Sequence, residues 1–426
     1  MASLLIKNGR VLSPEDNLDG ELDLLIEDGV IRQVAPRITA RVDETIEARG
    51  HVVAPGFIDL HCHLREPGGE ISETIETGLA AAVAGGFTAV CAMPNTRPVN
   101  GSPEATRTLV EKARRVGLAR VFPMAAVSLG SQGESLTDFA TLVAAGAVGF
   151  TDDGRPVKTA GLMEQALEGA RGLDVPIADH CEDPGLSAGG VMNEGPISER
   201  LGLRGIPTPS EEACVARDLD LTEATGAHLH VQHLSTAGAM EMVRAAKRRG
   251  IRVTCEVTPH HFTLTDEAVA QYGTNAKMNP PLRSTRDVEA IIAGIMDGTV
   301  DALATDHAPH APELKQKLMS EAPFGIIGLE TALALALTQL VHPGRISLAH
   351  LVVLLSTNPA RIIHQPLGRL TGGGTGDITI FDPNLEWTYR ATEGRSKSRN
   401  SPFDGWKFIG AATATIVAGK IVYRRS

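Results

Sequence analysis

The residues best suited to chemistry lie in a short run near the start of the chain. His61 and His63 are separated by one residue at the end of an apolar run, and Arg65 follows two residues later. Side chains alternate across a strand, so His61 and His63 are expected on one face and Cys62 on the other. Two neighbouring imidazoles at the end of a buried strand form half of a metal site. The alternative is a pair of polar residues in a turn after a core strand.

The surrounding sequence predicts the elements that would position these residues. Strand-like runs alternate with helix-like runs, several of which end in glycine, the residue favoured just past a helix C-terminus. With the strand of His61 there are eight strand candidates, which predicts an α/β fold, a (β/α)₈ (TIM) barrel with parallel strands. The other seven runs are residues 87–93, 121–127, 146–152, 175–181, 228–234, 252–257 and 300–307.

The two ends of the chain differ from this alternating centre. Residues 1–50 read as short strands with hairpin signals at Asn8-Gly9 and Asp28-Gly29, and similar strands follow Gly372. Each end alone is too thin to bury a sheet face, so the ends are expected to pair into one small β-sandwich. The expected division is an N-terminal part of the sandwich (1–52), a barrel (53–366) and a C-terminal part (367–426).

Barrels of this kind place their chemistry at the carboxyl ends of the strands. Polar residues of the sequence fall there on at least five strands. Each alone could be a helix cap or a satisfied core histidine, but together they predict one site on one rim. They are His61, His63, Asn95, Asp152, Asp153, His180, His233 and Asp306.

This donor set indicates a catalytic metal centre. Imidazoles and carboxylates without thiolates suit Zn²⁺, Mn²⁺ or a similar ion. The candidates are too many for one tetrahedral ion and suffice for two ions that share a bridging carboxylate. Water bound to such an ion has its pKa lowered toward about 7, and Asp306 is the natural proton shuttle because it can reach both metal and water.

Four further histidines lie near these positions in the sequence and must be considered as alternative metal ligands. His228 and His230 have the opposite parity to His233 on a regular strand. If His233 faces the barrel interior, they should face the surrounding helices and be structural. The adjacent His260 and His261 cannot both point inward, and their role is left open.

The rest of the predicted rim suggests what is bound. Arg65 can hold a carboxylate in a two-pronged contact, the alternative being a surface salt bridge with Glu66. Asn95, Asn279 and His310 offer neutral or switchable donors. Residues 311–323 are polar, with prolines near both ends, and are expected to form a lid over the site.

Composition narrows the class of protein. The 426 residues carry a net charge of −11 and contain no basic run, which argues against a nucleic-acid partner. The five cysteines are widely spaced with no CxxC pair, so neither a disulfide framework nor a thiolate zinc knuckle is indicated. No signal peptide is evident and the apolar stretch 331–341 is too short to span a bilayer. A cytoplasmic protein that does not enter a membrane is expected.

Several motifs together resemble one known family. The chain is similar, nearly end to end, to bacterial members of the dihydroorotase family in the amidohydrolase superfamily. The resemblance implies reversible cyclisation of N-carbamoyl-L-aspartate to L-dihydroorotate in pyrimidine synthesis. The motifs are PGFIDLHCHLREPG (55–68), MPNTRP (93–98), FTDDG (150–154), HCED (180–183), EVTPHH (256–261), MNPPLR (278–283), ATDHAPH (304–310) and APFGIIGLE (322–330).

The resemblance also implies roles for individual residues. The bridging carboxylate falls on Asp153, which spacing alone could not choose over Asp152, and Asp306 is both ligand and general acid/base. The implied metal ligands are His61, His63, Asp153, His180, His233 and Asp306. The implied substrate contacts are His63, Arg65, Asn95, Asn279 and His310, with the backbone of Phe324 and Gly325.

The implied cofactor is Zn²⁺, two ions per subunit with one held weakly. Many relatives bridge their metals with a carbamylated Lys at the end of the fourth strand. GAVGFTDDG contains none, and the nearest, Lys158, lies beyond Pro156. The chain therefore resembles the subgroup that has Asp at this position.

Two other functions stay open at this stage. One is another cyclic amidase, a hydantoinase or allantoinase, although these usually carry the bridging Lys and lack the LREPG and MPNTRP pair. The other is a non-catalytic subunit of a carbamoyl-transferase assembly, although such members have lost metal ligands. The expected partners are a small-molecule substrate and a second copy in a homodimer, with association with aspartate carbamoyltransferase as an open alternative.

Overall fold

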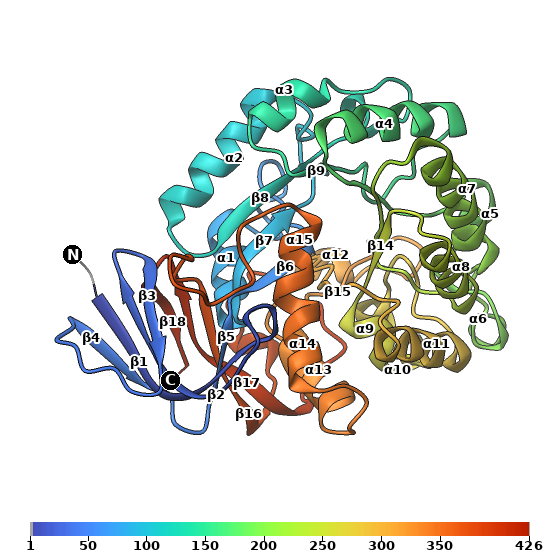
Figure 1. The fold of residues 1–426 in the computed structure, drawn as a ribbon. Helices are drawn as coiled ribbons and strands as arrows, with labels where there is room; N and C mark the ends of the chain where they lie inside the picture. Colours follow the sequence, from blue (N-terminus) through green and yellow to red (C-terminus); the bar gives the residue numbers. More distant parts are fainter. Residues whose placement is uncertain (1–2, 426) are drawn as a thin grey trace.

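The computed structural model describes residues 3–425 and contains a barrel-like sheet of eight parallel strands (Figure 1). The strands follow one another around the sheet in chain order. All eight strands coincide with the predicted runs, so the (β/α)₈ prediction is confirmed. They are β6 (Phe57–Cys62), β7 (Phe87–Ala92), β8 (Arg120–Ala125), β9 (Gly149–Phe150), β10 (Ile177–Asp179), β13 (Leu229–Val231), β14 (Val253–Val257) and β15 (Ala302–Leu303).

The first and last strands of this sheet meet and close the barrel. A parallel bridge joins Cys62 to His307, and the His63 amide donates to the His307 carbonyl over 2.9 Å. Earlier along the same two strands, the Thr305 amide donates to a carboxylate oxygen of Asp59 over 2.8 Å. The carboxyl ends of β6 and β15 are therefore neighbours, which brings the His61 and Asp306 segments together.

Helices surround the strands, as Figure 1 shows for the arc from α2 to α8. The predicted helices are all present, and two of the longest end at a left-handed glycine, Gly117 and Gly226, as the sequence indicated. They are α1 (Ile75–Ala84), α2 (Pro103–Val116), α3 (Phe139–Ala144), α4 (Ala160–Leu173), α7 (Pro209–Thr225), α8 (Ala237–Arg248) and α11 (Thr285–Met296).

Shorter elements decorate the rim and the other end of the barrel. Ile362 and Ile363, in and just after the last helix, pack with interior residues of the strands such as Ile58 and Ala302, and so help to plug the barrel. These elements are α5 (Pro184–Ser187), β11 (Met192–Asn193), α6 (Pro196–Leu201), β12 (Gly205–Ile206), α9 (Pro259–Thr263), α10 (Glu267–Tyr272), α12 (Pro312–Lys315), α13 (Ala332–Ala336), α14 (Leu348–Val352) and α15 (Asn358–Ile362).

The two ends of the chain pair into a second sheet, as predicted. Its order is β18-β17-β16-β5-β1-β2-β3, with β4 paired to β1. The ends meet where β16 runs antiparallel to β5. The strands are β1 (Ser3–Ser13), β2 (Leu18–Glu27), β3 (Val30–Ala35), β4 (Glu44–Glu47), β5 (Val52–Pro55), β16 (Ile378–Thr388), β17 (Lys407–Val417) and β18 (Lys420–Arg424). This sheet extends to Pro55 and the barrel begins at Phe57; the division at residues 52/53 and 366/367 stays a prediction.

One of the two predicted hairpins is wrong. Asp28-Gly29 does form the tight turn between β2 and β3. Asn8-Gly9 instead lies inside β1, where the pairing with β2 shifts register. The Asn8 amide donates to the Asp23 carboxylate over 2.9 Å, so the left-handed Asn8 is accommodated as a bulge and the strand continues. Among residues 3–425, no helix is long and apolar enough to cross a membrane.

Candidate metal centre

Four of the predicted ligands converge at the carboxyl end of the barrel. The Nε2 atom of His61 lies 3.3 Å from Asp153 Oδ1 and 3.5 Å from Asp306 Oδ1. The Nε2 atom of His63 lies 3.1 Å from Asp306 Oδ1 and 3.5 Å from Asp153 Oδ2. All four side chains are buried. Two imidazoles therefore face the same two carboxylates, as predicted from the spacing at the end of β6.

The remaining two predicted histidine ligands also approach Asp153. His180 Nδ1 and His233 Nε2 are 2.9 Å apart, and they lie 3.9 and 3.8 Å from Asp153 Oδ1. Among residues 3–425, Asp153 is thus the one carboxylate within 4 Å of all four imidazoles. Its neighbour Asp152 points elsewhere and accepts hydrogen bonds from the amide and hydroxyl of Ser128. The geometry distinguishes the two aspartates, which the spacing could not.

The donor set fits a divalent metal. Three overlapping groups of donor atoms lie within 4.8 Å of one another, and all their residues are buried. His61 Nε2 is buried and has no hydrogen-bond partner among the described residues. A buried polar nitrogen left without a partner is costly, and an ion among the carboxylates would satisfy it. The groups are His61, His233 and Asp306; His61, His63 and Asp153; and Asp153, His180 and His233.

Strained backbone marks the same rim. Arg65, His233 and Asp306 have φ angles of 58°, 32° and 42°, in the left-handed region that residues with a Cβ rarely adopt. Such strain of about 1–3 kcal/mol per residue persists only where the surrounding structure fixes it, typically at functional sites. Each of these residues lies just past a strand, where the turn redirects its side chain.

The turn at His233 overturns the prediction for His228 and His230. They were expected to face the surrounding helices because their parity is opposite to that of His233. Instead, β13 ends at Val231, and the left-handed His233 breaks the alternation. His230 points into the barrel, where its Nε2 lies 3.2 Å from Glu256. The alternating residue Val231 packs in the outer core, so the parity argument failed because the strand is shorter than assumed.

His228 is also inside the barrel and is held by a hydroxyl. Its Nε2 lies 2.9 Å from the Thr254 Oγ1 atom, which also meets His230 Nδ1 at 2.9 Å. Burial lowers the pKa of His228 to about 3, with the neighbouring His230 acting in the same direction. Both side chains therefore form a polar layer beneath the site.

Glu256 is a site residue that sequence reasoning missed. Its Oε1 lies 2.8 Å from His61 Nδ1, the nitrogen that faces away from Asp153. Burial disfavours the charged form, but hydrogen bonds from His230 and His61 outweigh it and hold the pKa at about 2. A carboxylate on Nδ1 fixes the tautomer and aims the Nε2 lone pair at the centre. Glu256 lies two residues after Thr254 on β14, so the two side chains share the face of the strand that points into the barrel. This alternation is the sequence signal that could have identified Glu256.

Arg65 is a cation without a carboxylate partner among the described residues. Its Nε donates to the Pro309 carbonyl over 3.1 Å. The alternative pairing with Glu66 is excluded, because Glu66 binds Lys112 and the Ile75 amide. Burial lowers the pKa of Arg65 to about 10, so the side chain stays charged at neutral pH. An unpaired guanidinium beside the centre is placed to receive an anion.

Comparison with known proteins decides the family. A family model described as "Dihydro-orotase-like" matches residues 50–239. A dihydroorotase of Solibacter usitatus is 52% identical over 422 residues, covering 99% of this chain and 98% of that protein. A dihydroorotase of Syntrophus aciditrophicus is 49% identical over 423 residues and 99% of both chains. The chain belongs to the dihydroorotase family.

Solved structures place the family's fold next to the hydantoinases. The L-hydantoinase (dihydropyrimidinase) of Arthrobacter aurescens is 26% identical, with a TM-score of 0.89 over 100% of this chain and 97% of that one. A D-hydantoinase of a Thermus species is 26% identical, with a TM-score of 0.83 over 99% and 95%. The barrel and the terminal sheet of this dihydroorotase-family chain are thus shared with cyclic amidases.

Two predicted substrate residues of this family member, Asn95 and Asn279, lie beside candidate metal ligands. Asn95 links two candidate ligands, accepting from His63 Nδ1 at 2.9 Å and donating to Asp153 Oδ2 over 3.0 Å. Across the rim, Asn279 donates to Glu182 over 2.6 Å, close to His180. Both amides therefore face the centre, and their contact with substrate stays a prediction.

His260 and His261 separate as the sequence required. The ring of His261 points away, with Nδ1 2.8 Å from the Thr258 hydroxyl and Nε2 3.0 Å from the Pro280 carbonyl. His260 is buried and its Nε2 lacks a hydrogen-bond partner among residues 3–425. Burial lowers its pKa to about 4, so it is a neutral side chain near the centre.

His310 lies between Arg65 and Phe324, the residue that follows the predicted lid. Its Nε2 lies 2.7 Å from the Phe324 carbonyl and 3.3 Å from Arg65 Nη2. Burial and the Arg65 charge lower its pKa to about 3. The short contact with the carbonyl requires a proton on Nε2, so His310 is a neutral imidazole that donates to the backbone of Phe324.

This pKa gives a testable prediction for pH dependence. Because His310 gains its second proton only near pH 3, it should add no inflection to the profile of kcat/KM between about pH 5 and 8. The profile of His310→Asn should then have the shape of the wild-type profile at a lower amplitude. Loss of an inflection near neutrality in the variant would contradict the assignment.

Two buried lysines that the sequence analysis did not single out fasten the predicted lid. Lys277 Nζ donates to the carbonyls of Met319 and Ala322, each over 2.6 Å, and lies 4.4 Å from the centre of the Phe324 ring. Lys315 Nζ donates to the carbonyls of Pro323 and Gly325 over 2.9 and 3.0 Å. No carboxylate pairs with either lysine among the described residues. Their donors hold the backbone that carries Phe324 and Gly325.

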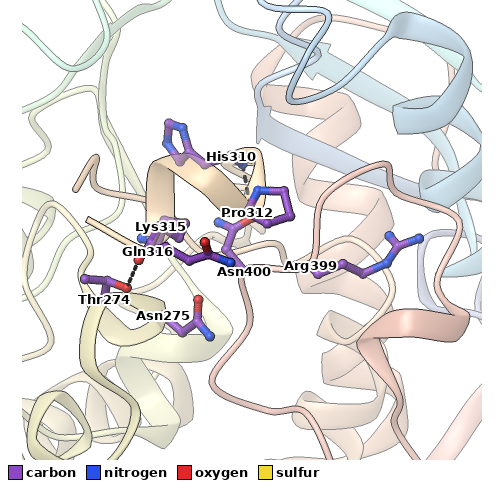
Figure 2. Close-up of a pocket in the computed structure, with 8 residues that line it drawn as sticks. All are labelled: Thr274, Asn275, His310, Pro312, Lys315, Gln316, Arg399 and Asn400. Carbon is purple, nitrogen blue, oxygen red and sulfur yellow. Dashed lines mark hydrogen bonds between the residues drawn. The ribbon is translucent and has the colours of Figure 1, made fainter. Parts of the chain in front are cut away.

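Asn400, from the segment after β16, completes this attachment. Its side chain donates to the carbonyls of Ala308 and Gly325, each over 3.0 Å, and accepts from the His310 amide over 3.0 Å. Figure 2 shows His310, Lys315 and Asn400 around the short helix α12, lining a cleft with Arg399. The backbone at Phe324 and Gly325, just after the predicted lid, is thus tied to the DHAPH segment at several points.

Replacing Lys315 with Met should loosen this attachment without unfolding the barrel. The variant keeps the side-chain length but removes both hydrogen bonds. The Pro323 carbonyl then loses its side-chain donor, at a cost of about 1–3 kcal/mol, whereas the Gly325 carbonyl keeps Asn400. We expect KM to rise about tenfold and residues 316–325 to become sensitive to protease. Lys317→Met, at an exposed position of the same loop, is the matched control. Equal KM and equal cleavage in both variants would contradict a positioning role for Lys315.

Proposed function

We propose that this protein is a dihydroorotase that interconverts N-carbamoyl-L-aspartate and L-dihydroorotate plus water in pyrimidine synthesis. The observation that carries the proposal is the unpaired guanidinium of Arg65 beside a centre of four imidazoles and two carboxylates. A small molecule that carries both a carboxylate, for Arg65, and an amide, for the metal centre, would match these two features. The whole-chain likeness to proteins named dihydroorotase supports the same substrate.

The proposed cofactor is Zn²⁺, with two ions sharing Asp153. His61, His63 and Asp306 would hold one side of the centre, and His180 and His233 the other. When bound, the metal supplies Lewis acidity and lowers the pKa of water toward about 7. Glu256 and Asn95 fix the ring orientations of His61 and His63 from outside.

The proposed proton carrier is Asp306. In hydrolysis, water oxygen bonds to the ring carbonyl carbon and the carbon–nitrogen bond breaks. Asp306 accepts the proton that the attacking oxygen gives up and returns it to the leaving nitrogen. Ring closure is the reverse, with water as the product. Arg65, with Asn95 and His310 beside it, would hold the carboxylate that does not react, and the backbone of Phe324 and Gly325 would border the ring.

The position of Lys158, the lysine nearest in sequence to Asp153, argues against a hydantoinase that bridges its metals with a carbamylated lysine. Lys158 Nζ lies 3.9 Å from Glu134 and its side chain is 54% exposed. It therefore points to solvent rather than to the four imidazoles. A carbamylated lysine at this position could not bridge the centre as it stands, so Asp153 remains the proposed bridge.

The reaction assay separates the candidates directly. Purified protein would be assayed with L-dihydroorotate before and after chelation and after zinc is added back, with hydantoin and allantoin as comparison substrates. Selective turnover of dihydroorotate that zinc restores is expected. Turnover of a comparison ring instead would reject the substrate. Metal-loaded protein without turnover of any ring would favour the non-catalytic subunit.

We also propose a homodimer located in the cytoplasm, with association with aspartate carbamoyltransferase as an alternative assembly. The five cysteines are all free and buried, which suits a reducing compartment. Light scattering after size-exclusion chromatography, alone and with the transferase added, tests the assembly. A monomer under both conditions would reject it.

Arg65→Met tests the proposed carboxylate contact. Hydrogen bonds to charged groups contribute about 1.5–3 kcal/mol, so KM should rise about 10- to 100-fold. The contact exists in both ground and transition states, so kcat should change little. Arg65→Lys, which keeps the charge but not the two-pronged geometry, should fall between. A loss confined to kcat would contradict the assignment.

A further inference from the structure

A second cluster of potential ligands lies on the opposite face of β10 from His180. Asp179 and Cys181 flank His180, so they point outward where His180 points into the barrel. Cys214 and Asp218 lie one turn apart on α7 and face them. These four side chains are between 0% and 5% exposed. We call them the β10–α7 cluster.

The four donor atoms of the β10–α7 cluster lie within 4.8 Å of one another. Cys181 Sγ lies 3.8 Å from Asp179 Oδ2 and 3.6 Å from Asp218 Oδ2. Cys214 Sγ lies 3.6 Å from each of the same two oxygens. A tetrahedral ion with metal–sulfur bonds of about 2.3 Å and metal–oxygen bonds of about 2.0 Å has sulfur–oxygen edges of about 3.5 Å. The four observed edges match this spacing to within a few tenths of an ångström.

The two thiol protons do not account for all the sulfur–oxygen contacts of the cluster. Two thiols carry two protons, whereas the cluster has four equivalent sulfur–oxygen contacts. Asp179 Oδ1 is buried and has no hydrogen-bond partner among the described residues. The Asp179 carboxyl group also hydrogen-bonds with the Asp218 carboxyl group, and its Oδ2 atom contacts the two thiols and, at 3.8 Å, Arg217. A buried carboxylate in this state is costly unless a cation completes its surroundings.

Arg217 is the one cation that the structure places beside the cluster. Its Nε donates to Asp218 over 2.7 Å, and its Nη2 lies 3.3 Å from Cys214 Sγ. When a bound metal ionises both thiols and both carboxyl groups, the cluster has four negative charges, of which Arg217 offsets one. A divalent ion would offset two more, and Arg217 would then act as the outer donor that thiolate ligands commonly receive.

We propose that Asp179, Cys181, Cys214 and Asp218 bind a structural Zn²⁺ ion, at a site separate from the candidate catalytic centre. Four protein ligands and no open position are typical of structural zinc sites. Two thiolates favour zinc over the hard ions Mg²⁺ and Ca²⁺. Binding releases the thiol protons to solvent, so affinity rises with pH. The ion would fix the end of β10 and thereby the position of His180.

The proposal is independent of the reaction, so its test does not rely on turnover. The full-length protein is stripped of metal, loaded with Co²⁺ and examined by near-ultraviolet absorption. Thiolate–cobalt charge transfer is expected from the β10–α7 cluster alone, because the catalytic centre offers only nitrogen and oxygen donors. Cys214→Ser should abolish that band and reduce bound metal by one ion per chain. Cys255→Ser, at another buried thiol, should retain both.

X-ray absorption of the zinc-loaded wild type provides a measurement that needs no variant. Sulfur scattering at about 2.3 Å from zinc is expected. Zinc with only nitrogen and oxygen neighbours would overturn the proposal even if Cys214→Ser failed to fold. So would equal metal content in wild type and a folded Cys214→Ser protein. The cluster would then be metal-free, with a proton shared between its two carboxyl groups.

Discussion

Asp306→Asn should lower kcat by about a thousandfold while the protein stays folded. The amide keeps the size of the side chain but cannot accept and return a proton, and general acid–base catalysis typically contributes about 10²- to 10⁴-fold. Asp306 lies 3.1 Å from His63 and 3.5 Å from His61, on a left-handed turn that fixes its direction. Steady-state assay with dihydroorotate, with circular dichroism for folding, measures the effect.

Two controls separate proton transfer from metal binding. Asp301→Asn changes a carboxylate just before the same strand, where it binds Lys247 outside the centre, and should leave kcat nearly unchanged. Metal content of Asp306→Asn should be determined in parallel, because the residue is also a proposed ligand. A variant that keeps its metal and more than about a tenth of wild-type kcat would reject Asp306 as the proton carrier.

The barrel and its rim were predictable because strand ends combine two strong signals. Alternating runs located all eight strands, and polar residues at their carboxyl ends located His61, His63, His180, His233 and Asp306. Both signals are local in sequence. Choosing Asp153 over Asp152 required the resemblance, since adjacent residues at a strand end differ only in where the following turn sends them.

What the sequence did not reveal depends on tertiary contacts. His230 was placed on the wrong face because the left-handed His233 interrupts a strand that looked continuous. Glu256 and Lys277 contact partners that are distant in sequence, so their roles can be recognised only from the tertiary structure. The β10–α7 cluster is hidden for the same reason: its two cysteines show no short spacing, and helix and strand geometry brings them together.

Replacing Asp153 with Ala should cause the candidate catalytic centre to lose bound metal. Asp153 is within 4 Å of all four candidate histidines, so its removal leaves them without a common carboxylate. Loss of an outer partner of a metal ligand lowers affinity or activity about 10- to 100-fold, so loss of the shared ligand should exceed this. At least one ion per chain should be lost and turnover should fall to background, measured by elemental analysis and assay.

Two neighbouring variants make this result specific. Asp152→Asn should lose stability, because it replaces one of the two oxygens that accept hydrogen bonds from Ser128, yet keep its metal. Lys158→Ala should match the wild type in both metal and activity, since Lys158 points to solvent. Repeating all three in a Cys214→Ser background removes any ion of the β10–α7 cluster from the count. Metal loss in Lys158→Ala, with Asp153→Ala unaffected, would instead assign the bridge to a modified lysine and return the protein to the hydantoinase type.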